Sequence, residues 1–118
     1  MRDPLLHYDR DGQPISFERW AELFELHDRH IGDDYIGTYR VSTVWIGLDH
    51  NFGMTGPPLI FESMVFAAGT AYDMDCRRYA TEADAQAGHD ELVLLLRATV
   101  QDDVDELLDD EPAKTDEQ

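Results

Sequence analysis

Two apolar segments separated by a loop of turn-forming residues dominate the hydrophobic pattern of the chain. They lie in residues 43–66, with the sequence TVWIGLDHNFGMTGPPLIFESMVF. Apolar and polar residues alternate with a period of two from about Tyr35 onward, which is typical of a long strand. The pattern predicts two antiparallel strands, residues 39–48 and 59–66, at the centre of a sheet.

The first of these strands is apolar on both faces near its end. One face has Tyr39, Val41, Thr43 and Trp45. The other face has Val44, Ile46 and Leu48. A strand that is covered on both sides is usually central in its sheet. We therefore expect a helix on one face and a second cover, such as a binding partner, on the other.

Two helices are predicted from caps and helical spacing. Ser16 is a good N-cap for a helix over residues 17–27, whose aromatic stripe is anchored in the core by Trp20. Thr81 is the N-cap of a second helix that runs to about Leu108. Gly88 inside this helix costs about 1 kcal/mol relative to Ala, so we expect it where the helix closely approaches the sheet.

The second helix should be longer than the domain. At 1.5 Å per residue it would span roughly 40 Å, against about 27 Å for a domain of this size. We expect its end to project or to meet a partner through a stripe that includes Val100, Val104 and Leu107.

Short strands complete the predicted fold. We expect one over residues 5–8, followed by a turn with a positive φ at Gly12, and another over residues 76–80. The fold class is therefore α+β, a mostly antiparallel sheet of about four to five strands covered by two helices, with a long C-terminal helix. Residues 1–100 form a single domain, and residues 101–118 are an acidic helix end and tail.

The net charge of the chain limits the classes of partner that it can bind. The chain has 26 Asp and Glu against nine Lys and Arg, a net charge of −17, which repels nucleic acid and favours cationic partners. We expect no direct nucleic acid binding.

The single Cys76 cannot form an intrachain disulfide, and no segment has the apolar length of a signal core or a membrane span. We expect a soluble, intracellular protein without membrane contact.

The sequence His27-Asp28-Arg29-His30, with Asp33 and Asp34 beyond it, is the most metal-like cluster. Two imidazoles three residues apart can share one helix face, but a zinc site needs further ligands from elsewhere. Gly32 is expected to end the helix. We interpret the cluster as a solvated helix end and predict neither a metal site nor a cofactor.

Candidate binding residues surround the loop between the two central strands. They are Trp45, Asp49, His50, Asn51 and Glu62. An imidazole beside carboxylates can act as a general base, whereas Asp49 and Asn51 also suit turn formation through side-chain bonds to the backbone. Glu62 is either a cross-strand partner or a ligand-contacting acid. Without a nucleophile elbow, a phosphate loop or a paired metal motif, we predict that the chain is not an enzyme.

Three blocks, TVWIGLDHNFG, PPLIFESMVF and RYATEADAQAGH, resemble a family of small uncharacterised proteins encoded by actinobacterial phages and some of their hosts. The resemblance covers about residues 8–93 and includes the start YDRDGQPISFERW. The chain departs from the family in a loop insert at residues 54–55 and in its acidic tail. The family has no activity to carry over, and the resemblance implies an accessory phage product in the cytoplasm of a bacterial host.

Function is narrowed to three hypotheses. We favour a non-enzymatic, acidic protein-binding module that contacts a basic surface of a host or phage protein, with nucleic acid mimicry as one form of it. A small-ligand binder or enzyme that uses the Asp49-His50-Asn51 loop is the first alternative. The second is a structural component that forms a homodimer through the C-terminal helix.

Overall fold

The computed structural model describes residues 6–26, 28–49, 55–67 and 73–109, with the side chains of residues 26, 73–75 and 103–109 excepted. It contains a two-stranded and a four-stranded antiparallel sheet and two helices. The elements are β1 His7–Tyr8, β2 Pro14–Ile15, α1 Phe17–Leu26, β3 His30–Ile36, β4 Tyr39–Trp45, β5 Phe61–Ala67, β6 Asp73–Tyr79 and α2 Glu82–Asp109. The α+β class and the long C-terminal helix are confirmed, whereas the strand count differs from the prediction, because the described strands form two sheets of two and four strands instead of one sheet of four to five.

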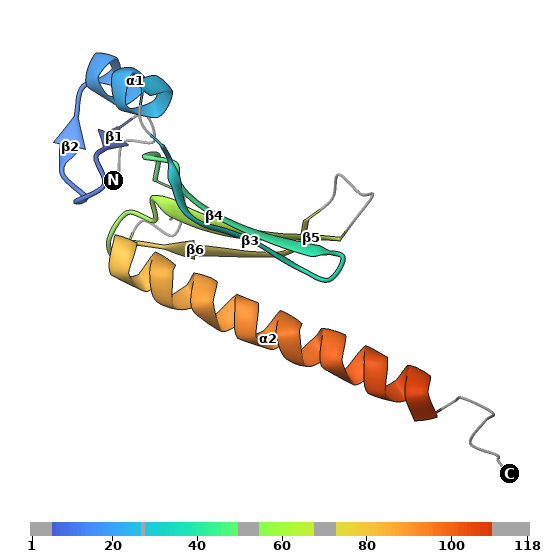
Figure 1. The fold of residues 1–118 in the computed structure, drawn as a ribbon. Coiled ribbons are helices and arrows are strands. Elements are labelled where there is room, and N and C mark those ends of the chain that lie inside the picture. The colour runs from blue at the N-terminus through green and yellow to red at the C-terminus, as the bar shows by residue number, and fades with distance from the viewer. Residues whose placement is uncertain (1–5, 27, 50–54, 68–72, 110–118) are drawn as a thin grey trace, which may run out of the picture.

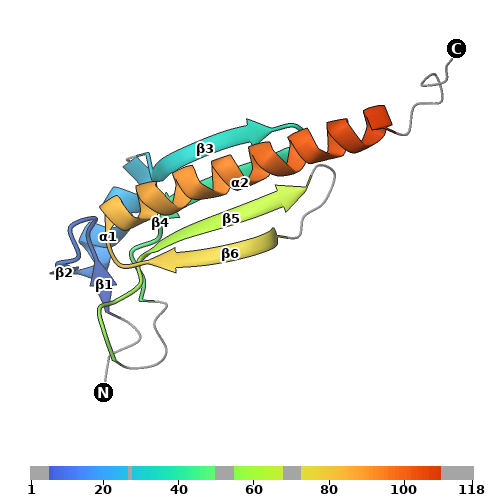
Figure 2. The same cartoon turned by 90° about the horizontal axis from the view of Figure 1, so that it is seen from below.

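The four-stranded sheet is a simple meander in the order β3-β4-β5-β6. Helix α2 contacts all four strands from one face, runs along the sheet between β3 and β5, and extends past the end of the sheet (Figures 1 and 2). Helix α1 instead lies at one end of the sheet, beside the β1-β2 hairpin (Figure 1). The prediction that two helices cover the sheet is therefore correct only for α2.

Both predicted N-caps are present. The Ser16 hydroxyl accepts a hydrogen bond from the Arg19 N–H at 3.1 Å, and the Thr81 hydroxyl accepts one from the Asp84 N–H at 3.1 Å. These bonds satisfy amides that the first turn of a helix leaves without a partner. The turn after β1 has the predicted positive φ, 86°, at Gly12.

The segment before β4 differs from the prediction. Helix α1 ends at Leu26, and Gly32 lies inside strand β3 rather than at a helix end. The expected long strand is two strands joined by a turn at Gly37 and Thr38, where Gly37 has a φ of 59°. Strand β3 has the sequence HIGDDYI, and charged residues are common on edge strands because they discourage pairing with other chains. Its weak apolar alternation is the reason that the pattern did not reveal it.

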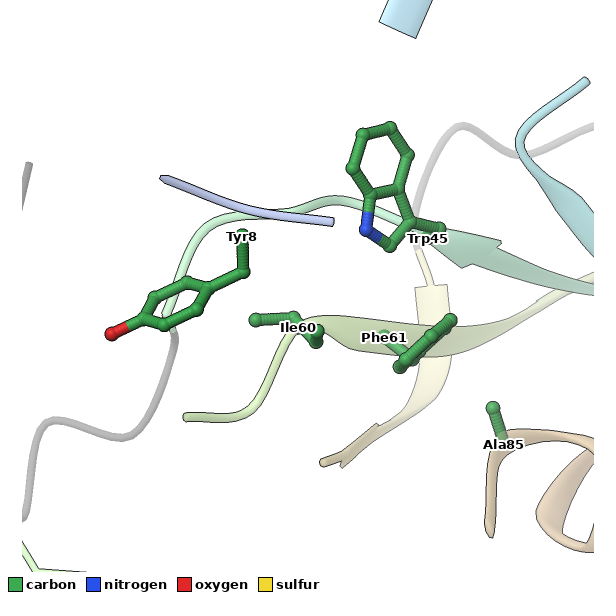
Figure 3. Packing of buried hydrophobic residues seen from close by; sticks show 5 residues of the cluster. All are labelled: Tyr8, Trp45, Ile60, Phe61 and Ala85. Carbon is green, nitrogen blue, oxygen red and sulfur yellow. The ribbon is translucent and has the colours of Figure 1, made fainter. Parts of the chain in front are cut away.

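The core lies between the sheet and α2 and has two apolar clusters. One contains Tyr8, Trp45, Ile60, Phe61 and Ala85 (Figure 3). The other contains Ile36, Val41, Val65, Leu92 and Val93. The alternation predicted for β4 and β5 is confirmed, because their residues facing α2 are buried and the intervening ones are half-buried.

Aromatic rings join α1 to the first cluster. The ring of Trp20 lies 4.7 Å from that of Phe24, which lies 6.1 Å from Trp45. The indole N–H of Trp20 donates to the Ile46 carbonyl at 3.0 Å. Trp20 therefore anchors the helix as predicted, with a polar contact as well as its rings.

Candidate functional site

The described residues of the loop after β4 have structural roles. Trp45 is 2% exposed and belongs to the core. Asp49 is buried, and its Oδ1 accepts a hydrogen bond from the Leu59 N–H at 3.0 Å, the type of turn-forming bond considered for it. The predicted site residues His50 and Asn51 lie outside the described residues.

Glu62 forms a cross-strand pair. It lies opposite Arg78 in the β5-β6 register, and its Oε2 accepts a hydrogen bond from the Arg78 Nε at 3.1 Å. Its side chain is 13% exposed. Of the two roles considered for Glu62, the structure shows the pairing role.

The candidate interaction helix contacts the sheet as far as Val100. Val100 is half-buried and packs against the second cluster, at a point where a Cβ on Gly37 would lie 3.1 Å from it. Val104 and Leu107 lie in α2, and their side chains are outside those described. The described part of the predicted stripe is thus used for packing within the chain.

The charged residues around the start of β3 pair with each other and with Arg40 on β4. The Asp28 carboxylate accepts hydrogen bonds from the N–H of His30 at 3.0 Å and from its Nδ1 at 3.2 Å, and these bonds lower the pKa of Asp28. Asp33 accepts two bonds from Arg40, at 2.9 and 3.0 Å, which lower the pKa of Asp33. In the described part of the chain no three potential metal ligands gather.

A chain of polar side chains crosses the core between the two apolar clusters. Its members are Asp34 on β3, Thr43 on β4, Ser63 on β5, Tyr79 on β6 and His89 on α2. The distances are 2.7 Å from Asp34 Oδ2 to His89 Nε2, 2.7 Å from His89 Nδ1 to Thr43 Oγ1, 2.5 Å from Thr43 Oγ1 to Ser63 Oγ, and 3.1 Å from Ser63 Oγ to the Tyr79 hydroxyl. The chain joins every strand of the large sheet to α2.

The donors of this polar chain have one consistent direction. When Asp34 accepts this bond, His89 Nε2 donates it, and in the tautomer that carries its proton on Nε2 the Nδ1 atom is an acceptor. Thr43 then donates to His89, Ser63 donates to Thr43, and Tyr79 donates to Ser63. In this direction each of the three hydroxyls donates one hydrogen bond, and those of Thr43 and Ser63 also accept one. Hydrogen bonds of this kind stabilise polar groups in a protein core.

Two glycines make room for this arrangement. A Cβ on Gly32 would lie 2.5 Å from His89 Nε2, and a Cβ on Gly88 would lie 2.2 Å from the Tyr79 hydroxyl. Both distances are far below van der Waals contact. The close approach of helix and sheet predicted at Gly88 is confirmed. Gly32, on strand β3, likewise leaves room for the His89 ring.

The polar chain reaches the surface at Asp34, in a groove between β3 and α2. The groove has a volume of about 320 Å³ and is lined by Asp34, Asp90, Val93, Leu94 and Arg97. The side chain of Asp34 is 54% exposed, whereas that of His89 behind it is 2% exposed. The groove thus presents a carboxylate fixed from behind by a buried imidazole. Figure 2 shows β3 and α2 side by side along this edge.

An acid, an imidazole and a hydroxyl in sequence are also the parts of a nucleophilic triad. Here Thr43 and Ser63 are both 0% exposed, so neither hydroxyl is open to a substrate. The accessible group of the polar chain is the Asp34 carboxylate. This arrangement supports binding of a donor or a cation at the groove.

A smaller cavity of about 140 Å³ lies at the other end of the core, lined by Arg10, Leu23, Asp28 and Trp45. The Arg10 guanidinium is held there by Glu82 at 2.9 Å and by the Asp28 carbonyl at 3.1 Å. Within the described residues the buried Nε1 of Trp45 has no hydrogen-bond partner. Of the predicted binding residues, Trp45 lines this cavity.

Sequence reasoning assigned no function to His89 and did not join it to Asp34. One signal was present: His89 follows Ala85 by four residues and precedes Leu92 by three, so it lies on the buried face of α2. A polar residue at such a position needs a partner. Its partners come from strands far away in the sequence, and spacing alone does not identify them.

Comparison of the chain with protein-family models, with curated proteins and with solved structures gives no match. Within the described residues, no helix combines the length and the apolar character needed to cross a membrane. The functional argument therefore rests on the geometry of the groove between β3 and α2.

Proposed function

We propose that this chain is an acidic, non-enzymatic protein-binding module whose β3-α2 groove receives a basic side chain of a partner protein. The observation that carries the proposal is the Asp34 carboxylate, half-exposed in the groove and bonded at 2.7 Å to a buried histidine. Following the family resemblance, we propose a host or phage protein as the partner, in the cytoplasm of a bacterial host.

The His89 contact preorganises Asp34 for binding. A carboxylate that is already oriented loses less side-chain entropy when a cation arrives than a freely rotating one. Asp34 retains acceptor capacity, because His89 uses only one of its lone pairs. A lysine or arginine of the partner can therefore form a charge-assisted hydrogen bond there.

The remaining walls suit the stem of a long basic side chain. Leu94 is 64% exposed and, with Val93, gives the groove an apolar side, along which methylene groups of lysine or arginine can pack. Asp90 adds a second carboxylate at the rim. Arg97 limits the groove to one cation and offers a donor to the partner's backbone or acidic groups.

The charge of the whole chain assists encounter with such a partner. Helix α2 has nine acidic residues and one arginine in its sequence, within a chain of net charge −17. A field of this sign raises the association rate of cationic partners and falls with ionic strength.

Nucleic acid mimicry is a narrower form of the proposal. The charge density of α2 instead favours binding to an ordinary basic protein surface. The 28 residues of α2 span about 42 Å, at 1.5 Å per residue. B-DNA of that length carries about 25 phosphate charges, nearly three times the acids of α2. The helix alone is therefore a weak imitation of DNA, and an ordinary basic protein surface is the better fit.

Charge-matched variants test the proposal. The probe is a fluorescein-labelled, lysine-rich peptide of about six residues, and binding is followed by anisotropy at two salt concentrations. Asp34→Asn with Asp90→Asn should weaken binding by about tenfold, or 1.4 kcal/mol. Asp11→Asn with Glu25→Gln removes the same two charges from exposed positions outside the groove and should change the affinity less than about twofold. Equal losses in the two pairs would show that only the overall charge matters and would overturn the groove assignment.

A further inference from the structure

The face of the large sheet opposite α2 is covered by no described element (Figure 1). The strand register arranges its residues in three rows across the strands: Tyr35, Arg40, Phe66 and Asp73; Asp33, Ser42, Met64 and Cys76; and His30, Val44, Glu62 and Arg78. We refer to these twelve residues as the open sheet face.

The centre of the open sheet face is apolar. Val44, Met64 and Phe66, on the two central strands, are half-buried, and Tyr35 on the edge strand is 74% exposed. An antiparallel sheet with one face in water normally has polar residues along that face. The apolar side chains of β4 and β5 therefore indicate that this face is covered in the functional state.

The charges of the open sheet face nearly cancel. Arg40 pairs with Asp33 at 2.9 Å, and Arg78 pairs with Glu62 at 3.1 Å. The face thus has two of the nine basic residues of the chain and only three of its 26 acids. Nearly all of the charge of −17 is carried by the rest of the molecule, so two copies that meet at this face repel each other less than two copies that meet through the acidic α2.

The area of the face is near that needed for a dimer. Four strands about 4.8 Å apart and seven residues long at about 3.3 Å each cover about 440 Å². Two such faces bury roughly 900 Å² in total if each face is treated as flat. This area is close to the roughly 1,000 Å² at which specific interfaces begin. An interface of this size lies at the lower end of the range for specific complexes, where weak and transient associations are found.

We propose that the occupant of the open sheet face is a second copy of this chain, packed sheet on sheet about a two-fold axis. The two α2 helices then lie on the outer sides of the dimer. Both β3-α2 grooves stay accessible, so the dimer is bivalent. The inference is independent of the proposed function, because it uses the opposite face of the sheet.

Sedimentation equilibrium of the full chain tests the dimer. In about 0.15 M salt, from about 5 to 500 µM, a range that brackets a micromolar Kd, the mass should rise from 13.5 kDa toward twice that value. Phe66→Glu should give a monomer throughout. Tyr35→Glu changes a side chain that is 74% exposed, so it should fold normally and also give a monomer.

Leu94→Glu is the matched control, because it adds the same charge at an exposed position on α2, on the other side of the sheet. It should leave the dimer intact. A wild-type monomer at every concentration would overturn the proposal, as would a dimer that survives Tyr35→Glu or that is lost in Leu94→Glu. Peptide binding at the groove should persist in Tyr35→Glu, which separates failure of the dimer from failure of the proposed function.

Discussion

At the scale of single residues, Gly88 determines how closely α2 approaches the sheet. Alanine at an open helical position would stabilise the helix by about 1 kcal/mol. Here the new Cβ would lie 2.2 Å from the Tyr79 hydroxyl and 2.4 Å from its ring, and moving that ring breaks its bond to Ser63. We expect Gly88→Ala to lower the free energy of unfolding by about 1–3 kcal/mol, measured by urea denaturation. An increase in stability would show that the helix lies farther from the sheet than described.

Thr43 is the link between His89 and Ser63. Valine has nearly the same shape but no hydroxyl, so Thr43→Val leaves His89 Nδ1 without its donor in the core. A buried polar group without a partner costs about 1–3 kcal/mol, and we expect that loss of unfolding free energy in urea. Ser42→Ala removes the neighbouring hydroxyl on the open sheet face and should cost much less. Equal effects of the two changes would contradict the polar chain.

Single-residue rules account for the features that the sequence predicted well. The caps at Ser16 and Thr81 and the contact at Gly88 depend on a residue and its near neighbours. The bond between His89 and Asp34 joins residues 55 positions apart and depends on the register of β3 against β4. That register is a tertiary property, and no spacing in the chain encodes it visibly.

At the scale of elements, β3 and β4 are joined across the hairpin by Arg40 and Asp33. The Arg40 hydrogen bonds are the largest cause of the lowered pKa of Asp33, and the charge of Arg40 lowers it further. Because the folded pKa lies below the unfolded value of 3.8, the pair stabilises the fold above that pH. The stabilisation is lost as the pH falls through the folded pKa.

Arg40→Gln should therefore raise the pKa of Asp33 toward its ordinary value, as followed by NMR titration of the carboxyl carbon. Arg78→Gln is the control, because Arg78 pairs with Glu62 on the same face and should leave the pKa of Asp33 unchanged. A pKa of Asp33 that is the same in Arg40→Gln as in the wild type would contradict the described pairing.

Helices and strands also differ in how well the apolar pattern of the sequence predicts them. The existence of helix α2 and of strand β5 was predicted, from an N-cap and apolar spacing for the helix and from an apolar run for the strand. Strand β3 was missed because Asp33 and Asp34 interrupt its period and Gly32 suggested a helix end. Those same residues serve the site, since Asp34 lies in the groove and Gly32 admits His89.

At the scale of the whole molecule, the large sheet separates two surfaces with different charge. The acidic α2 and the β3-α2 groove lie on one side, and the open sheet face, whose charges nearly cancel, lies on the other. A basic partner and a second copy can thus bind at the same time without competing. The apolar far side of β4 already suggested a second cover from the sequence, and the structure supplies the face on which it would lie.

The central claim, that the groove receives a basic side chain, is tested most directly by NMR. The ¹⁵N-labelled full chain is titrated with the lysine-rich peptide, and a peptide of the same length with glutamate in place of lysine is the control. We predict that the largest amide shifts occur at Asp34, Asp90 and Leu94 and that the control peptide produces none there. Shifts that spread evenly over the acidic surface, or that centre outside the β3-α2 groove, would contradict the account.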